Sequence, residues 1–211
     1  MTDEEIILQI KQFKGFMMIY NCAIREVKTK FEVLNEDLSV LRKRNPIEFI
    51  ESRVKSPESI LKKLKRKKLP YSLGSIVDNI NDIAGVRVIC GFIDDIYEVA
   101  HMLEIQDDVT VLEIKDYIKN PKPNGYRSYH MIVEIPVFFA NRKQNIKVEV
   151  QLRTIAMDFW ASLEHQMRYK ERKKVDDIKQ IAAELKECAD IIAATDEKMQ
   201  QINKRIASIN T

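Results

Sequence analysis

The chain has 211 residues, of which 45% are hydrophobic and 32% are charged, and its formal net charge is +3. This length and composition fit one substantial core with a heavily charged surface. No apolar run approaches the roughly 20 residues of a membrane span, and the acidic start MTDEEIILQI is unlike an export signal, so we expect a cytoplasmic protein that does not bind membranes.

The first 41 residues carry apolar side chains in alternating steps of four and three, the spacing of one face of a long helix. The series is Ile6, Ile10, Phe13, Met17, Tyr20, Ile24, Val27, Phe31, Leu34, Leu38 and Leu41. We assign residues 1–44 to this helix, and residues 173–211 repeat the pattern. Each narrow stripe needs a partner, and the protein's own core or a second copy of the chain fits equally well.

Residues 53–68 hold eight lysine and arginine residues against Glu58 alone. An excess of this size points to a polyanion, such as nucleic acid, a membrane surface or the phosphates of a nucleotide. Ser56-Pro57 predicts a helix over about 57–68, because serine is a good N-cap and proline suits the first helical position.

Ser59, Lys63 and Arg66 share one face of this predicted helix, and Arg53 and Lys55 lie just before it. Cationic side chains, a hydroxyl and the free N–H groups of a helix start together suit phosphate. A solvated basic face or a non-specific RNA-binding patch explains the same residues, and the physics of the segment alone favours this second interpretation.

A mixed α/β core is expected over residues 45–172. Its predicted elements are a strand at 86–92, a helix at 94–105, a strand at 109–115, a loop at 117–128, strands at 129–138 and 145–153 that pair as a hairpin, and a helix at 155–171, with a break near 172–174.

Charged residues lie in or beside the predicted strands. Arg87 lies inside an apolar strand, where it is costly unless it stacks on a base or pairs with a carboxylate such as Glu149. Asp82 and Glu149 could together hold Mg²⁺, although Asp82 could equally cap a turn. Glu149, Gln151 and Arg153 share the polar face of their strand, which is also compatible with simple solvation.

The loop segment 122–130 offers Lys122, Tyr126, Arg127 and His130, a mixture that suits base stacking and phosphate binding. The chain contains no G-x-x-x-x-G-K-[ST] motif, so a nucleotide site here is not a P-loop. It also contains no His-Asp dipeptide, so a metal hydrolase of the HD type is not supported.

Five segments taken in order resemble the synthetase domain of the RelA/SpoT homologue family, and in particular its stand-alone small alarmone synthetases. They are PIEFIESRVKSPESILKKLKRK (46–67), NDIAGVRVIC (81–90), NGYRSYH (124–130), VEVQLRT (148–154) and MDFWASLEHQMRYK (157–170). The resemblance implies an α+β fold, with a nucleotidyltransferase-like mixed sheet surrounded by helices. It also implies a homotetramer and a GTP pyrophosphokinase that uses ATP, GDP or GTP, and Mg²⁺, and that synthesises (p)ppGpp without hydrolysing it.

The resemblance also implies a role for each matching residue. Arg53 and Arg87 would sandwich the adenine of ATP, and Asp82 and Glu149 would coordinate Mg²⁺, with Glu149 also accepting the proton of the 3′-hydroxyl. The ATP phosphates would contact Lys55, Ser59, Lys63 and Arg66. The GDP or GTP site would comprise Lys122, Tyr126, His130, Gln151, Arg153 and Glu164.

The chain departs from its relatives at four positions. Asp158 and Lys115 stand where some relatives have asparagine and arginine. Glu32 and Glu51 align with a lysine and a threonine that bind product between subunits in some tetrameric relatives, so we expect no activation by product. Two alternative functions stay open: a degenerate relative that binds single-stranded RNA, and a nucleotidyltransferase that transfers a nucleoside monophosphate.

Overall fold

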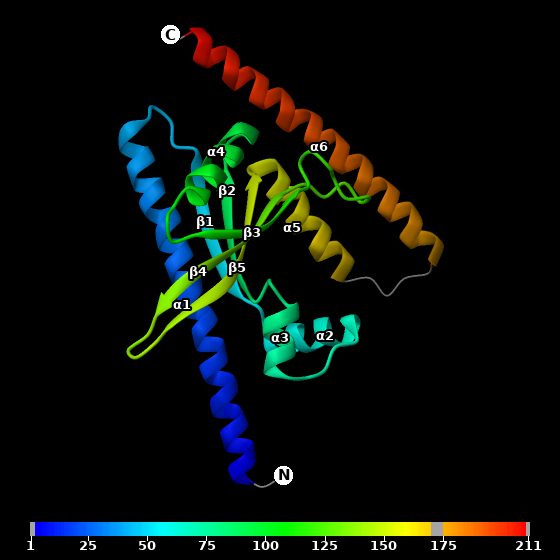
Figure 1. The fold of residues 1–211 in the computed structure, drawn as a ribbon. Helices are drawn as coiled ribbons and strands as arrows, with labels where there is room; N and C mark the ends of the chain where they lie inside the picture. The colour runs from blue at the N-terminus through cyan, green and yellow to red at the C-terminus, as the bar shows by residue number, and fades with distance from the viewer. Residues whose placement is uncertain (1–2, 170–174, 210–211) are drawn as a thin grey trace.

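A five-stranded sheet in the order β1-β2-β5-β4-β3 forms the centre of the computed structural model, which describes residues 3–169 and 175–209 (Figure 1). The elements are α1 (Asp3–Leu41), β1 (Ile47–Val54), α2 (Pro57–Lys67), α3 (Leu73–Asn79), β2 (Ala84–Cys90), α4 (Ile93–Glu104), β3 (Thr110–Asp116), β4 (Tyr129–Phe138), β5 (Lys143–Thr154), α5 (Ile155–Tyr169) and α6 (Val175–Ile209). Strands β2 and β5 run parallel, and the other neighbours are antiparallel. The predicted α+β class with a mixed sheet is confirmed.

Most predicted elements are present, including the helix after Ser56, the 117–128 loop and the β4–β5 hairpin. Strand β2 ends at Cys90 rather than at the predicted residue 92, because the side chain of Asp95 accepts a hydrogen bond from the Phe92 N–H and starts α4. Strand β1 and helix α3 were not predicted. The predicted break near 172–174 lies outside the described residues.

One face of the sheet is apolar and packs against α1. Val86 and Val88 of β2 lie beside Val150 and Leu152 of β5 on this face, and all four are buried. Helix α1 contacts β1, β2, β4 and β5. Burial of side chains from strands and helix is the main stabilising contribution to this layer.

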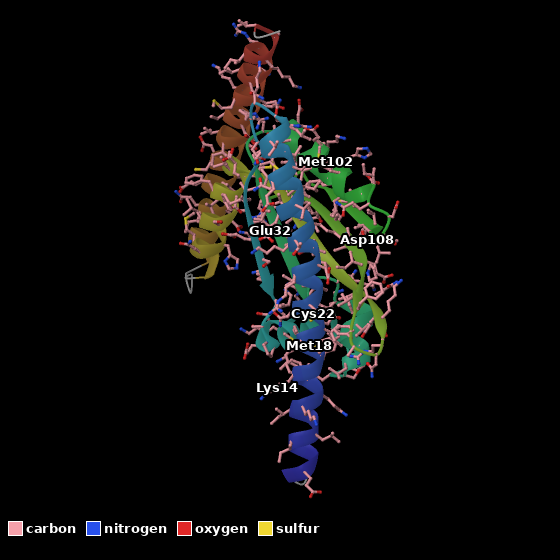
Figure 2. The ribbon with its side chains drawn as sticks, turned by 90° about the vertical axis from the view of Figure 1, so that its left-hand side faces the viewer. Lys14, Met18, Cys22, Glu32, Met102 and Asp108 are labelled. Atoms are coloured by element: carbon pink, nitrogen blue, oxygen red, sulfur yellow. The ribbon has the colours of Figure 1, made fainter. Side chains whose placement is uncertain are left out.

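The stripe of α1 is mainly tertiary packing, since Tyr20, Ile24, Val27 and Phe31 are all buried in the core. Figure 2 looks onto the outer side of this helix, where Lys14, Met18, Cys22 and Glu32 point away from the sheet. The stripe of α6 differs, because its later members remain exposed: Met199, Ile202, Ile206 and Ile209. None of the described helices is long and apolar enough to cross a membrane.

An ion pair joins α4 to the segment that follows α1. Arg44 donates two hydrogen bonds to Asp95, at 2.8 and 2.6 Å, and Asp95 is only 5% exposed. A second pair nearby, between Arg42 and Glu98, is more exposed to solvent, because the carboxylate side chain is 41% exposed there and 7% exposed in Asp95.

Replacing Asp95 with alanine should therefore lower the free energy of unfolding by about 2–4 kcal/mol, since Arg44 loses its partner and α4 loses its N-terminal hydrogen bond. Glu98→Ala, in the exposed pair, should cost less than about 1 kcal/mol. Urea unfolding of both variants checks this expectation, and equal losses would contradict it.

Candidate active site

The strand register places a row of polar side chains on the sheet face opposite α1. Arg53 of β1 lies beside Gly85 of β2, and Gly85 lies beside Glu149 of β5. Directly opposed residues of neighbouring strands share a face, so Arg53 and Glu149 flank the position where Gly85 has no side chain. The next row, strand by strand, consists of Glu51, Arg87, Gln151 and His130.

This arrangement leaves a cavity with about 400 Å³ of empty space on the polar face. Its lining residues are Glu51, Ser52, Arg53, Asp82, Gly85, Val86, Arg87, Glu149 and Gln151. The two arginines expected to hold adenine and the two carboxylates expected to hold Mg²⁺ therefore line one cavity.

Asp82 lies just before β2 and faces two lysines. Lys63 Nζ is 2.8 Å from Asp82 Oδ1, and Lys55 Nζ is 3.0 Å from Asp82 Oδ2. Burial raises the pKa of Asp82, but the two ammonium groups outweigh it and bring this pKa below its ordinary value. Asp82 Oδ1 is buried and makes an ion pair without a well-oriented hydrogen bond. The carboxylate therefore pairs with lysines instead of capping a turn, and it is ionised.

Helix α2 begins as its sequence predicts. The Ser56 side chain accepts a hydrogen bond from the Ser59 N–H, and Pro57 occupies the first helical position. Lys63 points from this helix to Asp82. Ser59 and Arg66 are exposed and lie outside the cavity lining, and Arg66 forms no ion pair with the part of the chain that the structure describes. Of the three residues on the predicted phosphate-binding face, Lys63 is the one that contacts a cavity-lining residue, through its ion pair with Asp82.

Glu149 is the second carboxylate of the cavity. His130 Nδ1 lies 3.5 Å from Glu149 Oε1, and the Gln151 side-chain amide donates to Glu149 Oε2 at 2.7 Å. Burial, the largest single influence, raises the pKa of Glu149, while His130 and Gln151 lower it further than burial raises it. The result is a carboxylate whose pKa lies below its usual range.

Arg87 pairs with two carboxylates, neither of which is Glu149. Its Nη1 lies 3.2 Å from Asp158 Oδ1 and 3.4 Å from Glu51 Oε2. The interpretation that Arg87 pairs with a carboxylate agrees with these contacts, but the partners differ from the example of Glu149: the β1–β2 register brings Glu51 opposite Arg87, and α5 brings Asp158. Burial and the neighbouring Arg153 lower the pKa of Arg87.

A second cavity, with about 860 Å³ of empty space, adjoins the first. Both are lined by Arg53, Arg87 and Gln151. The remaining residues of the second lining are Tyr126, Arg153, Ala161, Ser162, Glu164, His165 and Gln166. Four of the six residues predicted to bind GDP or GTP therefore line this second cavity, next to the predicted ATP site.

The other two residues predicted to bind GDP or GTP, Lys122 and His130, contact Tyr126. Tyr126 Oη lies 2.8 Å from His130 Nε2 and accepts a hydrogen bond from Arg153 Nη2 at 2.6 Å. Lys122 Nζ lies 4.6 Å from the centre of the Tyr126 ring. Desolvation lowers the pKa of Lys122. His130 contacts Tyr126 and Glu149, and so connects the residues predicted to bind GDP or GTP to the first cavity.

Several residues that organise this site were not predicted as site residues. Asp158 accepts a hydrogen bond from Arg153 at 2.9 Å, and the buried Ser128 hydroxyl accepts one from Arg153 Nε at 3.3 Å. Asn124 donates to Glu164 and so ties the loop to α5. Asp158 lies in one of the segments that resemble the family. Its pairing with Arg153 and Arg87 depends on the direction in which α5 continues from the end of β5, and the spacing of apolar residues does not predict this direction.

The family model described as "Region found in RelA / SpoT proteins" matches residues 52–174, a range that holds every predicted site residue. The chain belongs to the RelA/SpoT family. Among curated relatives, GTP pyrophosphokinase YwaC of Bacillus subtilis is 46% identical, covering 93% of each chain. GTP pyrophosphokinase YjbM of the same organism is 35% identical, covering 93% of this chain and 90% of its own.

Solved structures agree with this family membership. Small alarmone synthetase 1 from Bacillus subtilis, bound to its product pppGpp, superposes with a TM-score of 0.85 at 36% identity, covering 93% of this chain and 98% of that chain. Small alarmone synthetase 2 from the same organism gives a TM-score of 0.82 at 47% identity, covering 92% and 98%. The expected small alarmone synthetase fold is confirmed.

Proposed function

We propose that this RelA/SpoT family member is an alarmone synthetase, a GTP pyrophosphokinase. It transfers the β,γ-pyrophosphate of ATP to the ribose 3′-hydroxyl of GDP or GTP, giving ppGpp or pppGpp and AMP. The observation that carries the proposal is the pair of adjoining cavities that share Arg53, Arg87 and Gln151. Two nucleotides must lie side by side for this transfer, because their reacting atoms have to approach within about 3–3.5 Å.

The first cavity takes ATP in this proposal. The guanidinium groups of Arg53 and Arg87 provide flat cationic surfaces for the adenine. Lys55 and Lys63 bind the phosphates, together with Ser59 and Arg66 farther along the basic segment. Because both lysines are paired with Asp82, ATP binding must transfer part of their contact from the carboxylate to phosphate oxygens.

The second cavity is the acceptor site, which takes GDP or GTP, and the first cavity is the donor site, which takes ATP. Tyr126 stacks on the guanine, while Lys122 and His130 bind phosphates and Gln151, Arg153 and Glu164 line the site. Glu149 accepts the proton of the attacking 3′-hydroxyl. Its lowered pKa makes it ionised but only a modest base, so positioning must supply most of the rate enhancement.

The residues present fit a divalent cation. Asp82 and Glu149 line one cavity, both have lowered pKa values, and Asp82 Oδ1 is buried without a well-oriented hydrogen bond. Within residues 3–169 and 175–209, no three His, Cys, Asp or Glu side chains form a metal cluster, so phosphate oxygens would complete the coordination. Mg²⁺ bound here would neutralise negative charge on the transferred group.

Incubation with ATP, GDP or GTP, and Mg²⁺ tests the reaction. Nucleotide chromatography should show AMP and a 3′-pyrophosphorylated guanine nucleotide in equal amounts, and chelation of Mg²⁺ should stop both. Release of pyrophosphate in place of AMP would instead identify a nucleotidyltransferase that transfers a nucleoside monophosphate.

A second proposal rests on the exposed cations of α2, Lys62, Lys65, Arg66 and Lys67. These side chains could bind single-stranded RNA, either beside the synthetase activity or in place of it. Binding by this patch should weaken steeply with salt, because neutralised phosphates release counterions. Salt-dependent RNA binding without AMP release would favour a degenerate enzyme.

We also propose that residues 45–172 carry the chemistry, that the segments 1–44 and 173–211 are helical flanks of this domain, and that the protein is a homotetramer. Exposed apolar side chains of α6 support an assembly of this kind. Because relatives that match over most of their length are named as pyrophosphokinases, we propose synthesis without hydrolysis, in the cytoplasm where ATP and GTP are available. Glu32 and Glu51 are carboxylates and cannot donate hydrogen bonds to the phosphates of a product as a lysine and a threonine can, so added product should not raise the rate.

A further inference from the structure

Tyr117 contacts three residues of the proposed acceptor site at once. Its ring centre lies 4.5 Å from Lys122 Nζ, 5.2 Å from the His130 ring centre and 6.1 Å from the Tyr126 ring centre. We propose that Tyr117 is a positioning residue for the acceptor nucleotide, which holds Lys122, Tyr126 and His130 in their binding arrangement. This inference rests on the proposed function, because it takes these three residues as the GDP or GTP site.

The backbone fixes Tyr117 at the neck of the 117–128 loop. Its N–H donates to the Ser128 carbonyl at 3.0 Å, which closes the loop where β3 ends and β4 begins. Inside the loop, the Gly125 N–H donates to the Lys122 carbonyl at 2.8 Å and the Lys122 N–H donates to the Tyr126 carbonyl at 3.1 Å. The loop is therefore a small hairpin that folds Lys122 and Tyr126 back over the Tyr117 ring.

Lys122 lies between two aromatic rings. Its ammonium is 4.5 Å from the Tyr117 ring centre and 4.6 Å from the Tyr126 ring centre, both within cation–π range. A lysine side chain that is free in solution samples many rotamers, and fixing it in one of them is costly. Contact with the Tyr117 ring offsets this cost, so the ammonium is held beside Tyr126, the residue proposed to stack on the guanine.

The imidazole of His130 meets the Tyr117 ring edge-on, with an angle of 90° between the planes. This contact limits rotation of the imidazole while Nε2 bonds to Tyr126 and Nδ1 faces Glu149. Tyr117 thus restrains two phosphate-binding groups by its ring, and within residues 3–169 and 175–209 its hydroxyl makes no hydrogen bond. The ring should be essential for this role and the hydroxyl dispensable.

Three variants test the inference: Tyr117→Leu, Tyr117→Phe and the control Tyr71→Leu, which changes an exposed tyrosine outside both cavities. Tyr117→Leu should raise KM for GDP and GTP roughly three- to tenfold, the fold-change that corresponds to one partly desolvated cation–π contact. KM for ATP should change less than twofold. Tyr117→Phe and Tyr71→Leu should behave like the unmodified protein.

A double-mutant cycle with Lys122→Gln identifies the contact responsible. If the ring acts through Lys122, Tyr117→Leu should weaken GDP binding much less in the Lys122→Gln background than in the unmodified chain. Additive effects would overturn the part of the inference that concerns Lys122. Equal increases in both KM values, or a Phe variant as impaired as the Leu variant, would each overturn the whole inference.

Calorimetric titration with GDP separates this inference from the proposed function. If the unmodified protein binds GDP but releases no AMP from ATP and GDP, the proposed reaction fails while the Tyr117 effect on GDP binding can still be measured. If the protein releases AMP and Tyr117→Leu binds GDP normally, the positioning role fails and the proposed reaction stands.

Discussion

Replacing Glu149 with glutamine should lower kcat for alarmone synthesis by about 10²–10⁴-fold, the usual contribution of a positioned general base. Glutamine has nearly the same shape, so Gln151 and His130 keep a neighbour on β5. It cannot accept the proton of the 3′-hydroxyl, however, and it removes one of the two negative charges proposed to hold the metal. Rates of AMP formation at saturating ATP, GDP and Mg²⁺ check this expectation.

The matched control for Glu149→Gln is Glu104→Gln, the same chemical change at an exposed residue in the last turn of α4. This variant should retain full activity, and GDP binding to Glu149→Gln should stay within a few-fold of normal. If Glu149→Gln kept full activity, the assignment of the base would be wrong, whereas loss of GDP binding would indicate a structural role for Glu149.

Asp82→Asn should differ from Glu149→Gln in a way that separates the two carboxylates. The amide removes the charge that pairs with Lys55 and Lys63. The lysines are then free to bind phosphate, so ATP affinity should hold or rise while turnover and the response to Mg²⁺ fall.

Much of this site follows from local sequence patterns. The alternation in β5 predicts that Glu149 and Gln151 share a face, and the Ser56-Pro57 start predicts which residues of α2 point together. Such patterns need only the two periods of a strand and a helix, 2 and 3.6 residues. They carry no information on which strands become neighbours.

The pairing of Arg87 shows where local patterns stop. Glu51 faces Arg87 only because β1 lies along β2 in a specific register, and β1 has a mixed, mostly exposed sequence that gives no clear strand pattern. Asp158 reaches the same arginine from α5, 71 positions later in the chain. Contacts of this kind are set by topology, so the sequence suggested that Arg87 needed a partner without showing which carboxylate it was.

The contact between the 117–128 loop and α6 was also not predicted, although the loop contains a glycine at the point of contact. Gly125 has φ +85°, and a β-carbon built there would lie 2.4 Å from the Ala189 β-carbon of α6. Further hydrogen bonds fix helix α6 against the catalytic core, among them those from Thr154 to Asp196 at 2.6 Å and from Trp160 to the Leu185 carbonyl at 3.0 Å. The loop that carries Tyr126 therefore rests on the C-terminal helix (Figure 1).

Gly125→Ala should consequently impair the acceptor site more than the donor site. An L-residue at this φ costs about 1–2 kcal/mol, and the clash with α6 adds about 1–3 kcal/mol of overpacking. The loop or the helix must shift to relieve the clash, and displacements near 1 Å can lower a rate by about 10²-fold. We expect kcat/KM for GDP to fall about 10–100-fold, with KM for ATP nearly unchanged and a lower free energy of unfolding.

Two companion variants separate the causes of this loss. Gly74→Ala is the control, because Gly74 lies in α3 with nothing within 4 Å of a built β-carbon, and alanine there should raise the free energy of unfolding by about 0.5–1 kcal/mol. Adding Ala189→Gly to Gly125→Ala removes the clashing methyl group but keeps the backbone strain. Recovery of part of the lost kcat/KM for GDP would show that α6 positions the acceptor loop by direct contact, whereas no recovery would assign the loss to backbone strain alone.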